Sequence, residues 1–135
     1  MIFNSYKITI RRSRISKKED TNHKLQWFGS SLGLFSLRDK DKSCFRLFIE
    51  LLKYAKINMP LSSDELAYKL NLSRGTVVHH LNKLIEAGLV ITERNRYILR
   101  SSNLELLLDE MEKDIKQTLE DIRKIASDLD KELNL

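Results

Sequence analysis

A short stretch in the middle of the chain carries side chains that could read a DNA groove. Its candidate contact residues are Ser73, Arg74, Gly75, Thr76, Val78, His79, Asn82 and Lys83. Arginine, lysine and asparagine can pair with base edges in the major groove, and a small apolar side chain can contact thymine methyl groups. The first acidic residue after this set is Glu86. The residue types therefore predict one helix face that binds duplex DNA.

Few residues elsewhere suit catalysis or metal binding. Cys44 is the only cysteine, which excludes an internal disulfide and a zinc site built from several cysteines. His79 and His80 are adjacent, and neighbouring positions on a helix diverge by about 100°, so the pair cannot chelate one ion as residues four apart would. The sequence contains no glycine-rich phosphate loop and no nucleophile elbow. We therefore predict no enzyme activity, no catalytic site, no metal and no cofactor.

Two short helices must position the contact residues, and the first of them begins at a capping box. Ser62 and Glu65 have the Ser-x-x-Glu spacing at which a hydroxyl and a carboxylate satisfy the free amides of a helix start. This spacing predicts a helix from about Ser63. Leu66 and Leu70 fall on one face of that helix, so this face must be buried.

The second helix carries the contact residues themselves. Ser73 offers an N-cap, because its hydroxyl can accept from the amide of position 75 or 76, and the helix is predicted to run to about Ala87. Gly88 follows and suits the left-handed conformation that commonly ends helices. The apolar stripe that holds this helix on the domain consists of Val77, Leu81, Leu84 and Ile85.

The run SRGTVVHHL from Ser73 to Leu81, followed by Leu84 and by AGLV at 87–90, resembles the recognition helix of ArsR-like winged-helix regulators. The resemblance covers roughly residues 41 to 100. It implies a helix-turn-helix and a two-stranded wing in a dimeric prokaryotic repressor or activator. It also implies that the His80 side chain helps to hold the recognition helix against the rest of the domain. A winged helix used only for protein contacts is the alternative, since one fold hosts many functions.

After the second helix the pattern changes to the alternation of strands. Strands are predicted at 89–92 and 97–99, around a wing tip that runs from Glu93 to Arg96. Arg94 and Arg96 could reach phosphates or a narrow minor groove, but exposed arginines are also common on any surface. Glu93 opposes phosphate binding and could orient an arginine instead.

A further helix should precede the helix-turn-helix. Asp39 or Asp41 can cap a helix that runs to about Lys56, and Pro60 then belongs to the linker into the next helix. Cys44 falls in this helix and is expected to be a small core residue. The predicted buried positions are Phe45, Phe48, Ile49 and Leu52.

The sequence predicts a basic arm followed by an apolar loop segment in the N-terminal part of the chain. Alternation from Tyr6 to Ile10 predicts a short strand. The basic cluster that follows contains Arg11, Arg12, Arg14, Lys17 and Lys18. Such a cluster is typical both of arms that lie along a DNA groove and of solvated tails, and composition does not separate the two. The apolar patch from Trp27 to Leu37 contains glycines and serines, which predicts a structured loop rather than a long helix.

The C-terminal part predicts a long amphipathic helix. Apolar residues recur there at intervals of four and three, interrupted only by Thr118, at Leu104, Leu108, Met111, Ile115, Ile122, Ile125 and Leu129. A helix of about 30 residues carries a longer stripe than a body of roughly 60 residues can cover, so we expect two copies to pair through it as a coiled coil. Packing on its own domain is the alternative. The direction of pairing stays open, because the positions beside the stripe are acidic without basic partners.

Charge divides unevenly along the chain. Residues 1–100 contain 19 Lys and Arg against 9 Asp and Glu, whereas residues 101–135 contain 5 against 10. A basic body with an acidic end fits polyanion binding by the body alone. Because the sequence has no run of 18 apolar residues and no apolar leader, we expect a soluble, cytoplasmic protein without a membrane segment.

Together these patterns predict a mainly α fold with a small β wing, which is a winged helix-turn-helix with a long C-terminal dimerisation helix. The predicted parts are the arm and loop segment at 1–38, the DNA-binding domain at 39–100 and the dimerisation helix at 101–135. The predicted function is that of a homodimeric transcriptional regulator that recognises double-stranded DNA. Its helix from Ser73 to Ala87 would lie in the major groove, and its wing on the backbone or in the minor groove. The identities of the operator and of any effector ligand stay open.

Overall fold

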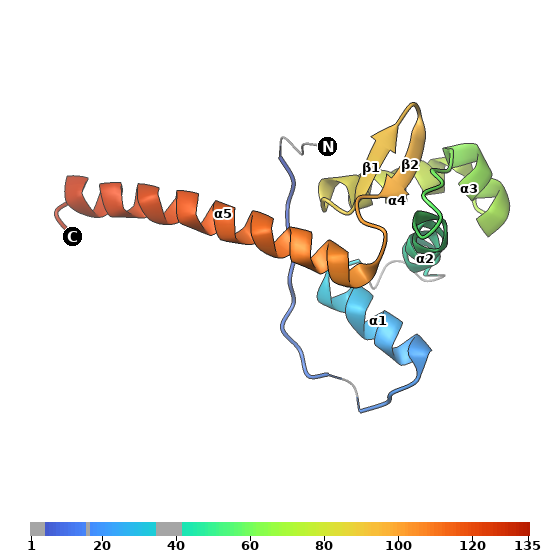
Figure 1. The fold of residues 1–135 in the computed structure, drawn as a ribbon, viewed down its shortest axis with the longest axis horizontal. Coiled ribbons are helices and arrows are strands. Elements are labelled where there is room, and N and C mark those ends of the chain that lie inside the picture. Colours follow the sequence, from blue (N-terminus) through green and yellow to red (C-terminus); the bar gives the residue numbers. More distant parts are fainter. Residues whose placement is uncertain (1–4, 16, 35–41) are drawn as a thin grey trace. The chain divides into compact units, whose positions relative to one another are not determined.

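The computed structural model describes residues 5–15, 17–34 and 42–135. These residues form helices and one two-stranded antiparallel sheet, in the order α1 (Thr21–Ser31), α2 (Ser43–Ala55), α3 (Ser63–Leu70), α4 (Arg74–Glu86), β1 (Val90–Glu93), β2 (Arg96–Leu99) and α5 (Leu104–Glu132) (Figure 1). The predicted class, mainly α with a small β wing and a long C-terminal helix, is confirmed. The chain divides into two compact units, Met1–Asn103 and Leu104–Leu135, which are described separately.

The start of α3 has the predicted capping box. The Glu65 amide donates to the Ser62 hydroxyl at 3.1 Å, and the Ser62 amide donates to the Glu65 carboxylate at 3.4 Å. Leu66 and Leu70 are buried, as their spacing predicts. The helix ends at Asn71, which has a φ of 54° and therefore turns the chain away from the helical path.

The next helix, α4, also begins and ends as predicted. The Ser73 side chain accepts from the Thr76 amide at 3.1 Å, which caps the helix. Gly88 has a φ of +75°, the left-handed conformation expected after the helix end. The predicted stripe faces the core, where Val77, Leu81 and Leu84 have almost no exposed surface.

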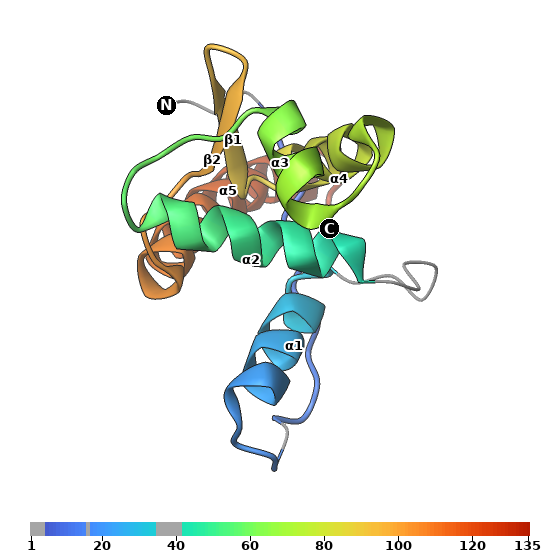
Figure 2. The ribbon, with the colours of Figure 1, turned by 90° about the vertical axis from the view of Figure 1, so that its right-hand side faces the viewer.

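The prediction of the buried face of α2 is largely wrong. Cys44 and Phe48 are buried as expected, but the other buried side chains of this helix include Leu47 and Leu51. The predicted positions Phe45, Ile49 and Leu52 are only half-buried. Arg46, Glu50 and Lys53 form one charged stripe along the helix, and the buried residues lie opposite to it. The predicted face was rotated towards the flank of this stripe. The buried face lies against α3, α4 and β2 (Figure 2).

The start of α2 also differs from the predicted cap. The helix begins at Ser43 after Lys42, which has a left-handed backbone and makes no side-chain capping bond. The predicted capping residues Asp39 and Asp41 lie outside the described residues.

The wing forms within one residue of its predicted bounds. Val90 pairs with Leu99 and Glu93 pairs with Arg96, which leaves Arg94 and Asn95 as a two-residue turn. Both turn residues have positive φ values, 50° and 65°, as tight hairpin turns that match the strand twist require.

The free edge of β2 is extended by one residue from outside the wing. The Leu61 amide donates to the Tyr97 carbonyl at 2.9 Å, and the Tyr97 amide donates to the Leu61 carbonyl at 2.7 Å. Leu61 therefore forms a one-residue bridge on the free edge of β2, directly before α3.

The strand predicted from Tyr6 to Ile10 does not form. Residues 5–15 instead run as a single extended trace, here named the N-terminal strap (Figure 1). The Lys7 amide donates to the carbonyl of Glu86 at 2.8 Å, and the Arg11 amide donates to that of Ser31 at 2.8 Å. These single bonds replace the ladder that a strand would need, because no neighbouring strand is available to the strap among the described residues.

The strap is fixed at its beginning by the Tyr6 side chain. A Cβ atom on Gly88 would lie 2.3 Å from the Tyr6 ring, so the ring packs directly on the glycine backbone. The Arg100 guanidinium lies over the same ring, with its carbon 5.8 Å from the ring centroid, and donates to the Tyr6 hydroxyl at 3.3 Å. Gly88 is therefore needed for the close approach of the strap as well as for its φ.

The loop predicted around Trp27 is in fact α1. Its N-cap is Asp20, and the Phe28 ring stacks on that of Phe48 at a centroid distance of 6.4 Å. A glycine inside a helix costs only about 1 kcal/mol, which such packing can offset. Gly29 is buried, and its small size fits that position. Phe35 and Leu37, the rest of the predicted apolar patch, lie outside the described residues.

The second unit is the single helix α5, with the predicted length of about 30 residues. Every residue from position 116 to the end of the chain is exposed. The predicted stripe residues Leu108, Ile122, Ile125 and Leu129 are exposed, Leu104 and Ile115 are half-buried, and Met111 is buried. The pairing of two copies through this helix stays a prediction.

Candidate nucleic-acid interface

The structure places the contact residues predicted on α4 along one side of that helix. Arg74, Gly75, His79 and Asn82 are exposed, whereas Thr76, Val78 and Lys83 are half-buried. Helix α4 is about 20 Å long from its rise per residue, and the major groove is about 12 Å wide, so the groove can admit this helix. The opposite side of α4 is buried in the domain, which leaves the predicted face available.

The N-terminus of α4 is built from Ser73, Gly75 and Thr76. The Ser73 hydroxyl donates to the Thr76 hydroxyl at 2.8 Å while it accepts from the Thr76 amide, so both side chains already serve the cap. A Cβ atom on Gly75 would meet nothing within 4 Å. The open surface and the free amides of a helix start suit an approaching phosphate group.

Arg74 is paired with an acidic residue of the preceding helix. Its Nε atom lies 3.6 Å from a carboxylate oxygen of Asp64, and both side chains are more than 70% exposed, at 72% and 78%. An exposed pair of this kind contributes about 0–1 kcal/mol. Arg74 can therefore exchange Asp64 for a base edge or a phosphate at little cost.

His80 holds the buried side of α4, as predicted. Its Nε2 atom and the Ser43 hydroxyl are hydrogen-bonded at 2.6 Å, and the imidazole is buried. This bond joins the middle of α4 to the first residue of α2. His79, the next residue towards the N-terminus, is exposed.

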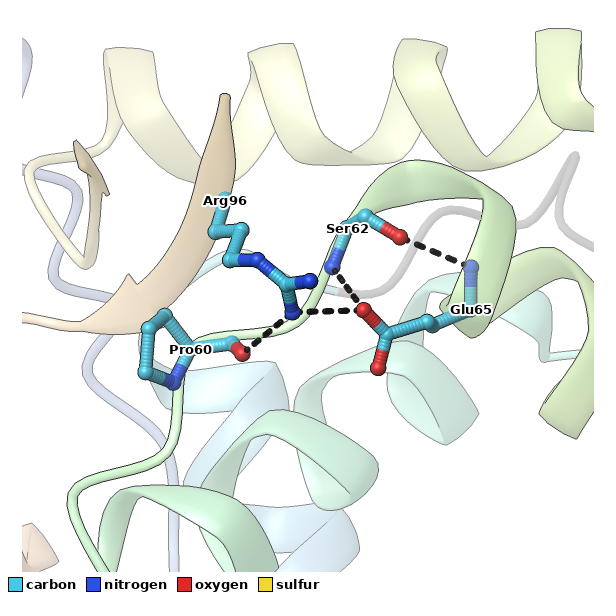
Figure 3. Close-up of polar contacts among 4 residues, drawn as sticks. All are labelled: Pro60, Ser62, Glu65 and Arg96. Atoms are coloured by element: carbon cyan, nitrogen blue, oxygen red, sulfur yellow. Dashed lines mark hydrogen bonds and ion pairs between the residues drawn. The ribbon is translucent and has the colours of Figure 1, made fainter. Parts of the chain in front are cut away.

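The two wing arginines lie in different environments. Arg94 is exposed at the tip of the hairpin, in a left-handed conformation that a non-glycine residue adopts at a cost of about 1 kcal/mol or more. Arg96 lies in the last strand pair before the turn and is held against the segment in front of α3: its Nη1 atom lies 2.6 Å from the Glu65 carboxylate and 3.4 Å from the Pro60 carbonyl (Figure 3). The acidic partner of a wing arginine is thus Glu65, not the predicted Glu93.

The same arrangement keeps Glu65 ionised. Partial burial by itself would raise the pKa of this carboxyl, but the hydrogen bonds from Ser62 and the charge of Arg96 outweigh it and lower the pKa below the ordinary 4.5. A carboxylate with a lowered pKa stabilises the fold above its ordinary pKa, and this contribution is lost as the pH falls through the lowered value. The ion pair with Arg96 is therefore fully formed at neutral pH.

The basic residues of the strap are not brought to the N-terminus of α4. Arg11, Arg12 and Arg14 are exposed, and the Arg14 carbonyl accepts a hydrogen bond from the Trp27 indole at 2.8 Å. The strap joins α4 at Glu86, at the opposite end of that helix from Arg74. The cluster is therefore neither a free tail nor part of the surface around Arg74.

Three side-chain contacts in this region were not predicted from the sequence. Asp64 holds Arg74, Glu65 holds Arg96, and Ser43 holds His80. The capping-box spacing already indicated one role for Glu65, but nothing in the sequence joins it to a residue 31 positions later.

Among the residues that the structure describes, no group of three or more His, Cys, Asp or Glu side chains could hold a metal ion. Within the same part of the chain, no helix combines the length and the hydropathy that crossing a membrane requires.

Helices α2, α3 and α4 with the hairpin β1 and β2 define a winged helix-turn-helix domain. Residues 50–92 match the family model described as bacterial regulatory protein, arsR family. This segment runs from α2 into β1 and includes both helices of the helix-turn-helix. The resemblance predicted from the sequence is thus confirmed over this segment, which is less than half of the chain. No curated protein matches the chain.

Proposed function

We propose that this chain is a transcriptional regulator that binds specific sequences of double-stranded DNA as a homodimer, in a prokaryotic cytoplasm. One observation carries the proposal: α4 has a buried side and an opposite side that presents Arg74, His79 and Asn82. A helix of this kind, preceded by α3 and followed by a wing, fits the major groove. A module that only contacts other proteins would not need donors for base edges on that side.

Each predicted contact residue at the start of α4 or along it has a role that follows from its chemistry. Arg74 and Asn82 pair with base edges, and Val78 contacts a thymine methyl group. Ser73, Gly75 and Thr76 allow the backbone at the helix start to approach a phosphate. His79 and Lys83 add donors along the same groove.

The wing supplies a second contact through Arg94. Its position at the tip of a hairpin lets the guanidinium reach the phosphate backbone or the minor groove beside the groove that α4 occupies. The strained backbone of Arg94 supports this role, because a turn selected only for stability would favour Asn or Gly there.

The stripe on α5 supports pairing of two copies. Within α5 after position 115 the large exposed apolar side chains are Leu119, Ile122, Ile125 and Leu129, and Leu133 follows the helix end. A long apolar stripe is more stable when it is buried against another apolar surface. A second copy of the chain carries the same stripe, so two copies can bury both stripes against each other. Two paired copies would read two half-sites about 34 Å apart, or a multiple of that distance.

Selection of bound duplexes from a random pool tests the proposed function. We expect a preferred sequence with two related half-sites, and an affinity that falls steeply with salt, because each phosphate contact releases counterions. The measurement is a titration of the selected and an unrelated duplex at several salt concentrations. Weak binding that does not depend on sequence, together with a stable protein partner, would support the protein-contact module instead.

The strap arginines contribute electrostatically in this proposal. We expect the triple variant Arg11→Gln/Arg12→Gln/Arg14→Gln to bind DNA more weakly, with the same preferred bases. The slope of log affinity against log salt concentration should become shallower by up to about 3. The same change of net charge is made on α5 in the control variant Arg123→Gln/Lys124→Gln/Lys131→Gln. If both variants keep the slope of the parent, the strap arginines face only solvent.

A further inference from the structure

The wing is attached to the segment in front of α3 by its backbone. The two hydrogen bonds between Leu61 and Tyr97, at 2.9 Å and 2.7 Å, place that segment on the free edge of β2. Leu61 is buried, so water does not compete for these bonds. The hairpin and the segment in front of α3 therefore share one small sheet.

A side-chain contact reinforces this attachment one residue further along the wing. Through one nitrogen, Arg96 donates to the Glu65 carboxylate at 2.6 Å and to the Pro60 carbonyl at 3.4 Å. The carboxylate oxygen that receives Arg96 is also the one that accepts from the Ser62 amide (Figure 3). A single oxygen atom thus completes the cap of α3 and holds the wing. We name Pro60, Ser62, Glu65 and Arg96 the wing anchor.

The wing anchor changes what Arg96 can offer to DNA. Its positive charge is matched by the ionised Glu65 at contact distance, so the pair brings little net charge to a phosphate. Arg94, two residues away, carries its charge at the exposed tip. The two wing arginines are therefore suited to different tasks.

We propose that Arg96 is a positioning residue, which fixes the wing to α3 through Glu65 so that Arg94 meets the duplex when α4 occupies the groove. This inference rests on the proposed function. A wing already held in its bound orientation loses less conformational freedom on binding than a free hairpin does. Arg96 then acts on affinity without a contact to DNA.

Two substitutions separate this role from direct phosphate binding. Glu65→Gln keeps the capping box, which accepts Gln at this position, and removes only the charge that holds Arg96. We expect Arg96→Gln and Glu65→Gln each to lower affinity for the selected duplex roughly three- to tenfold. The double variant should lose no more than either single variant, and all three should keep the salt slope of the parent.

Direct phosphate binding by Arg96 predicts the opposite result for Glu65. Removal of a nearby negative charge would then raise the affinity, and Arg96→Gln alone would flatten the salt slope by about 1. Either result overturns the positioning role. Arg94→Gln is the matched comparison in the same hairpin: it should flatten the slope by about 1. Glu65→Gln should cost little further affinity in the Arg94→Gln background, because the anchor acts through Arg94.

A measurement without DNA separates failure of this inference from failure of the proposed function. Amide hydrogen exchange in the wing, above all at Tyr97, should become faster by the same factor in Arg96→Gln, Glu65→Gln and the double variant. If no duplex is bound but exchange shows this coupling, the proposed function fails and the anchor stands. If duplexes are bound but wing exchange matches that of the parent in the three variants, the anchor fails and the proposed function stands.

Discussion

Substitution of Ile125 by Glu is expected to convert the protein from a dimer to a monomer and to lower its affinity for a duplex with two half-sites by at least about 100-fold. Ile125 lies on the stripe of α5 and is 57% exposed in the single chain, so the change should not disturb the chain itself. Pairing would bury two copies of the new carboxylate in an apolar seam, which is strongly unfavourable. Without pairing, the second half-site contact is no longer intramolecular.

Sedimentation equilibrium and duplex titration check this result on the same samples. Ser127→Glu is the control, because it adds the same charge two positions further along α5, on the side of the helix away from Ile125. It should stay dimeric and bind like the parent. If Ile125→Glu still sediments as a dimer, the interface lies in the other unit, for instance on α1 or α2, and α5 is not the dimerisation helix.

Arg74→Ala and Asn82→Ala are each expected to weaken specific binding by roughly 1–3 kcal/mol and to relax the preferred sequence at one position, because both side chains can pair with base edges. Both residues are exposed, so thermal unfolding of the variants should match that of the parent. Repeated selection with each variant would show which position of the duplex has lost its preference.

Two further variants sharpen this test. Arg123→Ala removes an exposed arginine from α5 and should leave the selected sequence unchanged. Asp64→Asn releases Arg74 from its acidic neighbour and should not weaken binding, since Arg74 must leave this pair to reach the groove. If Arg74→Ala and Asn82→Ala both bind the selected duplex like the parent, α4 does not read the major groove.

The helix-turn-helix could be predicted from the sequence because its signals are local. The Ser62 and Glu65 capping box, the Ser73 cap and the left-handed Gly88 each act within four residues of their partners. Local hydrogen-bonding chemistry of this kind constrains the backbone strongly. The side of α4 left for DNA followed directly from the apolar stripe opposite to it.

The errors arose where tertiary packing overrides local preference. Gly29 argued against a helix, yet α1 forms and stacks Phe28 on Phe48. The alternation from Tyr6 to Ile10 indicated a strand, but a strand needs a neighbour along its whole length. The Arg96 to Glu65 pair joins elements 31 residues apart, and no periodicity carries such information.

The N-terminal strap has a consequence for the order in which the protein is made. Tyr6 docks on Gly88 and on Arg100, and the Tyr6 to Arg100 bond spans 94 positions of the chain. The start of the strap therefore lacks part of its docking surface until Arg100 has been synthesised. Helices α2 to α4 depend on contacts much closer in sequence and can fold before that point. Tyr6 is thus translated before these helices, but it can complete its contacts only after them.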